Sequence, residues 1–335
     1  MGFSAGPRAF RDGPKQSRGV NGPAFTWHSL GSCEEARAGA YVTSFEHRQV
    51  QTNGISLHVA TAGDPKRAPV MFLHGFPEGW SSWRSIMEAL AADYFVLAPD
   101  LRGYGQSDRP AVGYGLMTLT DDIHDLVDRF TDQPITLVGH DWGGALTWMY
   151  GHRFGKTLRQ LVVVNCPHPH TFLKAVIGGQ DWQRLRSSYM VFFQIPWLPE
   201  TLLTGAGCWL LRRGLKLAEG SKGAMNAALV DELMRGFRTN RDLTGPLNFY
   251  REFVRNQFNK AERTRLMTQF ARPIPVPCTL IWGQKDRFLS ENVAKKSHEQ
   301  AHCDVEWRPL PGVGHFVSME APDRLLAELR RALTQ

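Results

Sequence analysis

Long hydrophobic runs are missing from this 335-residue sequence, and so are the usual marks of export. No apolar stretch approaches the roughly 18 residues that a membrane-spanning helix needs. The amino-terminal region also lacks the apolar core of a signal peptide, and carries Arg8, Arg11, Lys15 and Arg18 against Asp12. The sequence therefore predicts a cytoplasmic protein with no membrane span.

Cysteine is scarce, and its pattern excludes two kinds of site. The five cysteines are odd in number and scattered, and no two of them form a C-x-x-C pair, so neither a disulfide framework nor a zinc site is expected.

The net charge of +7 comes from 39 Lys and Arg against 32 Asp and Glu. No basic run is interleaved with aromatic residues, so we expect no nucleic-acid partner.

The rest of the composition is that of a globular protein, with 42% hydrophobic and 21% charged residues. Short apolar runs that end in Gly, Pro, Asn or Asp predict strands of a parallel sheet covered on both faces. One further run alternates apolar and polar residues, as a half-buried strand does. The predicted strands are 55–60, 70–73, 94–97, 135–138, 161–164, 279–282 and 305–308.

Helical patterns such as 119–127 separate these runs, and the alternation predicts an α/β doubly wound sheet. It stops near Pro167 and resumes near Pro275, and the block between them shows helical patterns but no clear strand. We therefore predict a disordered extension at 1–40, a core domain from 41–166 and 275–335, and an all-helical cap at 167–274. Such a cap would cover the carboxyl ends of the strands, where ligands of these sheets bind.

The segment Val138–Gly144 reads VGHDWGG and follows a predicted strand. Strand, glycine turn and helix form the setting in which many hydrolases place a nucleophilic serine, in the pattern G-x-S-x-G. Here the central residue is Asp141, and the helix predicted to begin at Trp142 favours an anion at its amino end. The alternative interpretation is an N-cap aspartate in an ordinary loop, because Asp caps helices well.

Two more residues complete the chain order nucleophile, acid, histidine that hydrolases with this turn use. Asp286 follows the predicted strand 279–282, and His315 follows the predicted last strand 305–308. The backbone N–H of Phe76, after the strand 70–73, can form an oxyanion hole together with the N–H of Trp142. All of these groups follow predicted strands, so we expect them to meet at one edge of the sheet.

These segments resemble the α/β-hydrolase superfamily and, within it, the epoxide hydrolases. The resemblance runs from about Phe45 to the carboxyl terminus and rests on HGFPEGWSSWR (74–84), DLRGYGQSDRP (100–110), GHDWGG, NCPHP (165–169) and the closing GHF. It implies that two cap tyrosines hold and protonate an epoxide oxygen. The segments 187–196 and 245–251 match the tyrosine-bearing ones and place these residues at Tyr189 and Tyr250. The alternative is that both tyrosines only pack in an aromatic-rich cap.

An aspartate suits a substrate that is attacked at saturated carbon. A serine would leave an ether, whereas a carboxylate leaves an ester whose carbonyl water can attack. The expected reaction is the conversion of an epoxide to a vicinal diol, with His315, oriented by Asp286, activating the water. No metal or organic cofactor is expected. An apolar small-molecule substrate is expected in a pocket formed by His140, Trp182, Phe193, Trp197, Phe249 and Phe316.

Three other functions stay open on the sequence alone. A haloalkane or haloacid dehalogenase also uses an aspartate, with Trp142 as halide donor, but has no need for two cap tyrosines. An ester hydrolase is disfavoured because the serine is missing. A non-catalytic protein that binds small molecules is disfavoured by the complete triad. The preferred epoxide, its enantiomer and the oligomeric state are left open.

Overall fold

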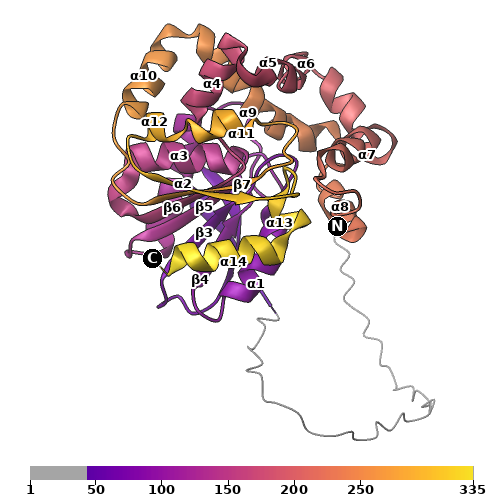
Figure 1. Cartoon of the computed structure of the whole chain (residues 1–335). Coiled ribbons are helices and arrows are strands. Elements are labelled where there is room, and N and C mark those ends of the chain that lie inside the picture. The colour runs from indigo at the N-terminus through magenta and orange to yellow at the C-terminus, as the bar shows by residue number, and fades with distance from the viewer. Residues whose placement is uncertain (1–43, 335) are drawn as a thin grey trace, which may run out of the picture. The chain divides into compact units, whose positions relative to one another are not determined.

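The computed structural model describes residues 44–334, and the predicted extension at 1–40 lies outside them. At the centre is an eight-stranded sheet in the order β1-β2-β4-β3-β5-β6-β7-β8 (Figure 1). Its strands are β1 (Glu46–Thr52), β2 (Ile55–Ala62), β3 (Pro69–Leu73), β4 (Phe95–Pro99), β5 (Ile135–His140), β6 (Leu158–Val164), β7 (Cys278–Gly283) and β8 (Val305–Leu310). Only β1 with β2 and β2 with β4 pair antiparallel.

Strands β3, β4, β5 and β7 are buried on both faces, which explains the continuous apolar runs in the sequence. In β3, Met71 and Leu73 pack into one core, whereas Val70 and Phe72 pack into a second core on the opposite face. Successive side chains of a strand point to opposite faces, so a strand covered on both sides must be apolar at every position.

Helices cover the two faces. On one side α2 and α3 pack together, and on the other side α1 packs against α14. The helices that flank the sheet are α1 (Arg84–Leu90), α2 (Leu116–Phe130), α3 (Trp142–Phe154), α11 (Glu291–Lys295), α12 (His298–Ala301), α13 (Val317–Glu320) and α14 (Pro322–Leu333). Short 3-10 turns lie at Trp80–Trp83, Gly155–Thr157 and Gln180–Trp182.

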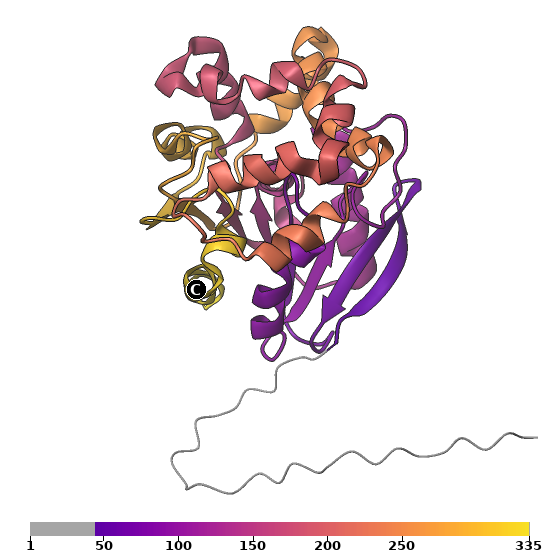
Figure 2. The same cartoon turned by 90° about the vertical axis from the view of Figure 1, so that its right-hand side faces the viewer.

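The elements between β6 and β7 are helical throughout, and Figures 1 and 2 show them gathered on one side of the sheet. We use the name cap for residues 167–274. Its helices are α4 (Pro169–Gly178), α5 (Gln183–Arg186), α6 (Tyr189–Phe192), α7 (Leu198–Ala218), α8 (Ala227–Met234), α9 (Asn240–Phe258) and α10 (Lys260–Phe270).

Helix α9 sits close to the core because two glycines meet. A Cβ on Gly245 would lie 2.7 Å from the Cα of Gly103, in the loop after β4, so neither position has room for a side chain. The guanidinium of Arg251 then joins α9 to α7, with 2.7 and 3.0 Å contacts to the buried carboxylate of Glu200. It also donates to the carbonyl oxygens of Phe193 and Ile195, after α6.

The predicted fold class, a mostly parallel α/β sheet with an inserted helical cap, is confirmed. Each of the seven predicted strands overlaps an observed strand in residue range, and the predicted helix 119–127 lies within α2. Strand β1 was missed. It lies at the edge of the sheet and most of its side chains are exposed, so its sequence EHRQVQT has no apolar run.

Candidate active site

Asp141 occupies a sharp turn between β5 and α3, with φ 49° and ψ −117°. A non-glycine residue in such a conformation costs about 1–3 kcal/mol and persists only where its surroundings enforce it. Here two glycines allow the turn to pack tightly. A Cβ on Gly75 would lie 2.4 Å from the Cβ of Asp141, and one on Gly143 would lie 2.1 Å from the carbonyl oxygen of Leu73.

The Asp141 carboxylate does not cap its own helix. It lies at the N-cap position of α3 without a capping hydrogen bond, and Oδ1 instead accepts from the backbone N–H of Phe76 at 3.0 Å. Oδ2 lies 3.7 Å from Nε2 of His315. An ordinary N-cap aspartate therefore does not describe this turn.

Behind Asp141, the predicted acid and histidine are in contact. Nδ1 of His315 lies 2.7 Å from Oδ2 of Asp286. Oδ1 of Asp286 accepts from the backbone N–H groups of Phe288 and Leu289. The side-chain amide of Asn165, directly after β6, donates to Oδ2 at 2.8 Å, and its own Oδ1 accepts from the N–H of Gly283 at 2.7 Å. The Asp286 carboxylate is thus held on every side.

The charges of these groups depend on one another. Burial alone would raise the pKa of Asp141, but His315 reverses this effect, and the pKa of Asp141 is lowered. Burial alone would lower the pKa of His315, but the carboxylates of Asp286 and Asp141 raise it to about 10. Near neutral pH the resting site therefore holds an ionised aspartate beside a protonated histidine.

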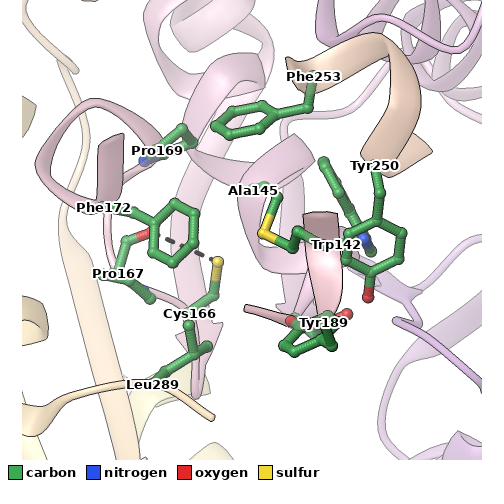
Figure 3. Close-up of a pocket in the computed structure, with 12 residues that line it drawn as sticks. Trp142, Ala145, Cys166, Pro167, Pro169, Phe172, Tyr189, Tyr250, Phe253 and Leu289 are labelled. Atoms are coloured by element: carbon green, nitrogen blue, oxygen red, sulfur yellow. Dashed lines mark hydrogen bonds between the residues drawn. The ribbon is translucent and has the colours of Figure 1, made fainter. Parts of the chain in front are cut away.

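Tyr189 of α6 and Tyr250 of α9 face the same space as Asp141, with their ring centroids 5.8 Å apart (Figure 3). The ring of Tyr250 also packs edge-on against Trp142 at 5.0 Å and Phe76 at 5.6 Å. Burial, together with the nearby charge of Asp141, raises the pKa of both tyrosines above the usual value. Both phenols therefore stay protonated and can donate hydrogen bonds.

Two apolar cavities meet at Asp141, Tyr189 and Tyr250. The smaller, of about 60 Å³, is lined on its far side by Cys166, Pro169, Phe172, Phe253 and Leu289, and Figure 3 shows these side chains around it. The larger, of about 320 Å³, extends the other way and is lined by Phe192, Phe193, Leu203, Leu211, Leu215 and Phe316. The carboxylate thus lies at the junction of two apolar spaces.

Of the six residues predicted to form the substrate pocket, five divide into three groups. Phe193 and Phe316 line the larger cavity. Phe249 is fully buried behind Trp142 and Tyr104 and lines neither cavity, so its assignment to the pocket was wrong. Trp182 and Trp197 are 74% and 70% exposed, so their assignment to the pocket was wrong. Both lie at breaks between helices, with φ of 58° and 52°.

His140 is the sixth, and it also lines neither cavity. It is completely buried, with Nδ1 2.8 Å from the carboxylate of Glu78 and Nε2 2.9 Å from the carbonyl oxygen of His315. Glu78 in turn accepts from the N–H of Gly75 at 2.6 Å. His140 therefore joins the loop that carries Phe76 to the backbone of His315, and its place in the pocket was a wrong expectation.

Sequence reasoning missed three residues that position the site: Asn165, Glu78 and Arg251. Asn165 stands at the end of a predicted strand, as Asp141 does, so the same argument could have found it. Glu78 lies inside the segment HGFPEGWSSWR, but no local signal shows that its carboxylate meets His140. Arg251 follows Tyr250 directly, and only the packing of α9 on α7 shows its partner.

Comparison with known proteins identifies the group. A family model described as alpha/beta hydrolase fold matches residues 68–198. The AB hydrolase superfamily protein YfhM of Bacillus subtilis is 37% identical over 76% of this chain and 85% of its own length. Human epoxide hydrolase 4 is 30% identical over 82% of this chain and 75% of its own length. The chain belongs to the epoxide hydrolase family of α/β hydrolases.

A solved structure of epoxide hydrolase A from Mycobacterium thermoresistibile supports this membership. It superposes with a TM-score of 0.75 at 26% identity, over 87% of this chain and 98% of the other. The relatives and this structural likeness together show that the chain is a hydrolase with the α/β-hydrolase fold. Within residues 44–334, no helix is long and apolar enough to cross a membrane. In the same part of the chain, no group of His, Cys, Asp or Glu side chains is arranged to hold a metal ion.

Proposed function

We propose that this protein hydrolyses epoxides to vicinal diols through a covalent ester on Asp141. The observation that carries the proposal is the position of its carboxylate, which faces Tyr189 and Tyr250 at the junction of two apolar cavities. A nucleophile and two hydrogen-bond donors thus share one largely apolar space, as ring opening requires.

In the first step, a carboxylate oxygen of Asp141 attacks one ring carbon and the bond from that carbon to the ring oxygen breaks. Tyr189 and Tyr250 donate hydrogen bonds to the oxygen as its negative charge develops, and one of them supplies the proton that it needs. The raised pKa of each phenol keeps that proton available at neutral pH. The product of this step is a hydroxyalkyl ester of Asp141.

In the second step, His315 removes a proton from water, which attacks the ester carbonyl. The resting histidine has a pKa of about 10, partly because the Asp141 carboxylate lies beside it. Ester formation removes that negative charge, so the pKa of His315 falls and the imidazolium gives up its proton, which restores the phenol that donated one in the first step. The neutral imidazole can then act as a base. The N–H groups of Phe76 and Trp142 stabilise the oxyanion. When it collapses, the ester bond to the substrate oxygen breaks, His315 returns its proton to that oxygen, and the diol leaves with the Asp141 carboxylate restored.

The two cavities support an apolar epoxide with substituents on both ring carbons, one in each space. The smaller cavity, of about 60 Å³, admits only a small group, whereas the larger, of about 320 Å³, admits a ring or a longer chain. A panel of such epoxides, run beside chlorinated and brominated alkanes of the same shape, distinguishes this proposal from a dehalogenase.

The deciding experiment uses His315→Gln. This variant keeps the nucleophile but lacks the base, so an epoxide should open and the reaction should stall at the ester. Intact-mass measurement should find one substrate mass added, and peptide mapping should place it on Asp141. The matched control is His298→Gln, an exposed histidine outside the site, which should turn over normally with no adduct.

A single turnover of the unmutated enzyme in heavy-oxygen water tests the second step. The label should enter the Asp141 carboxylate, because water attacks the ester carbonyl and not the substrate carbon. Label found in the diol alone, with no adduct in His315→Gln, would mean that water attacks the ring directly, and the covalent mechanism would then be wrong.

A further inference from the structure

The exposed apolar side chains of this protein are concentrated in the cap. Of the twelve large hydrophobic side chains that are exposed among the described residues, eleven lie between Ile177 and Phe258, and the other is Val112. Exposed apolar residues scattered singly are normal, but their concentration in one part of a protein marks a surface that binds something.

The positive charge is concentrated in the same part of the chain. Residues 167–274 hold 16 Lys and Arg against 8 Asp and Glu, a net charge of +8, whereas the other residues hold 23 against 24. The whole excess of +7 therefore resides in the cap. A partner that satisfies both features is apolar and negatively charged.

The second half of α7 combines the two features on a single side. Trp209, Arg213 and Leu217 follow one another at four-residue spacing and are all exposed, with the guanidinium of Arg213 lying 5.5 Å from the centroid of a Trp209 ring. Trp209 is 54% exposed and Leu217 is 53% exposed. A helix at a water interface carries polar residues on this side, so the Trp and Leu need another explanation.

A basic recess adjoins this part of α7. Its volume is about 560 Å³, and Arg212, Lys216, Lys222 and Arg287 line it together with Glu219 and Asp231. Asp231 pairs with Arg212, and the Glu219 carboxylate accepts from the N–H groups of Gly223 and Met225. Within residues 44–334 no ion pair joins Lys216, Lys222 or Arg287 to an acidic side chain, so the recess stays positive.

We propose that the outer face of α7, formed by Trp209, Arg213, Lys216 and Leu217, docks on an anionic lipid bilayer. Trp and Leu enter the boundary between headgroups and acyl chains, and the cations meet lipid phosphates, as in helices that lie on a membrane surface. A nucleic acid would use the cations but leave the Leu side chains exposed. A second copy of this chain would bring two positive caps together.

The opposite side of α7 lines the larger cavity, through Leu211 and Leu215. One helix thus separates the proposed lipid surface from the space that leads to Asp141. If the proposed function holds, an apolar epoxide dissolved in the bilayer has a short route to the site along this helix. The docking itself does not depend on that function, so its test measures binding alone.

The test is flotation of the full chain with vesicles made from equal parts of phosphatidylglycerol and phosphatidylcholine. The unmutated protein should float with these vesicles, remain behind with pure phosphatidylcholine, and be released as salt is raised. Arg213→Glu with Lys216→Glu should lower the partition coefficient more than about tenfold, since each cation contributes about 1 kcal/mol near such a surface. Trp209→Ala with Leu217→Ala should lower it by a similar factor.

The matched controls lie outside the cap. Lys66→Glu with Arg67→Glu makes the same charge change on exposed residues, and Val112→Ala removes an exposed apolar side chain. Both should float like the unmutated protein, and near-ultraviolet circular dichroism should show every variant folded. Equal flotation of cap variants and controls would overturn the proposal. So would a lack of flotation combined with a dimer that Trp209→Ala dissociates, because the face would then be a self-association surface.

Discussion

At the residue scale, the chemistry of this site depends on the negative charge of the Asp141 carboxylate. Asp141 and Asp286 lie on opposite sides of the His315 ring, at 3.7 and 2.7 Å from its two nitrogens. Two carboxylates hold the proton on the imidazole, and one carboxylate holds it less firmly. A nucleophile that loses its charge when it forms an ester can therefore turn its neighbour into a base at the moment when a base is needed.

This coupling can be measured without substrate. Asp141→Asn should lower the pKa of His315 from about 10, because one of its two negative partners is lost. Nuclear magnetic resonance of labelled histidine follows the titration, with His315→Gln assigning the signal. Asp93→Asn removes an exposed carboxylate far from the site and should leave the pKa of His315 unchanged. An unaltered pKa in Asp141→Asn would contradict the proposed second step.

The two phenols permit a second prediction at this scale. Tyr189→Phe and Tyr250→Phe should each slow ester formation, and the double variant should slow it by about a hundredfold or more, the range of general acid catalysis. Single-turnover rates measured in the His315→Gln background isolate this step. Tyr94→Phe, which loses only a hydrogen bond to the carbonyl oxygen of Leu333 outside the site, serves as the control. A double variant with the parent rate would show that the tyrosines only pack.

At the element scale, Arg251 sets the distance between the helices that carry the two tyrosines. It bridges α9 to α7 and to the carbonyl oxygens that follow α6, from a buried position. Arg251→Met should lower the free energy of unfolding by about 3–5 kcal/mol, because it leaves the buried Glu200 carboxylate without a partner. Urea denaturation measures this loss.

Two companion variants sharpen that measurement. Adding Glu200→Gln to Arg251→Met should restore part of the lost stability, since the buried charge is then removed as well. Arg48→Met breaks an exposed pair with Glu46 and should cost less than about 1 kcal/mol. A loss in Arg251→Met as small as that in Arg48→Met would show that the buried pair does not hold the cap together.

At the scale of the whole molecule, the site should make stability depend on pH. The pKa of His315 is raised from 6.5 to about 10 on folding, so its contribution is fully present below pH 6.5 and is lost as pH rises through about 10. The pKa of Asp141 is lowered, so its contribution is present above the usual Asp range and is lost as pH falls through the folded value.

Thermal unfolding between pH 6.5 and 9.5 tests the alkaline part of this expectation. The unmutated protein should lose stability steadily across this range, and His315→Gln should lose distinctly less, because the coupled proton is gone. His298→Gln keeps the site intact and should follow the unmutated protein. Parallel pH profiles for all three proteins would show that the His315 proton is not linked to folding.

The sequence by itself determined the parts of this protein that depend on neighbouring residues. An apolar run marks a strand that is buried on both faces, and a turn such as VGHDWGG needs glycines wherever the backbones approach closely. Parallel strands end at a common edge, so residues that directly follow them must come together, as Asp141, Asp286 and His315 do. These features depend only on neighbouring residues or on the order of strands along the chain, so they can be predicted from the sequence.

Only the tertiary structure decided which side of each cap helix is covered. Trp182 and Trp197 are as apolar as Phe193, yet they lie outside and Phe193 lies inside. The sequence could not show this, because short helices joined at sharp breaks carry no reliable periodicity. The partners of Glu78, Asn165 and Arg251 were also hidden, since these contacts join residues 51 to 121 positions apart. Which groups contact a buried charge depends on how the helices and loops pack, and packing exists only in the folded chain.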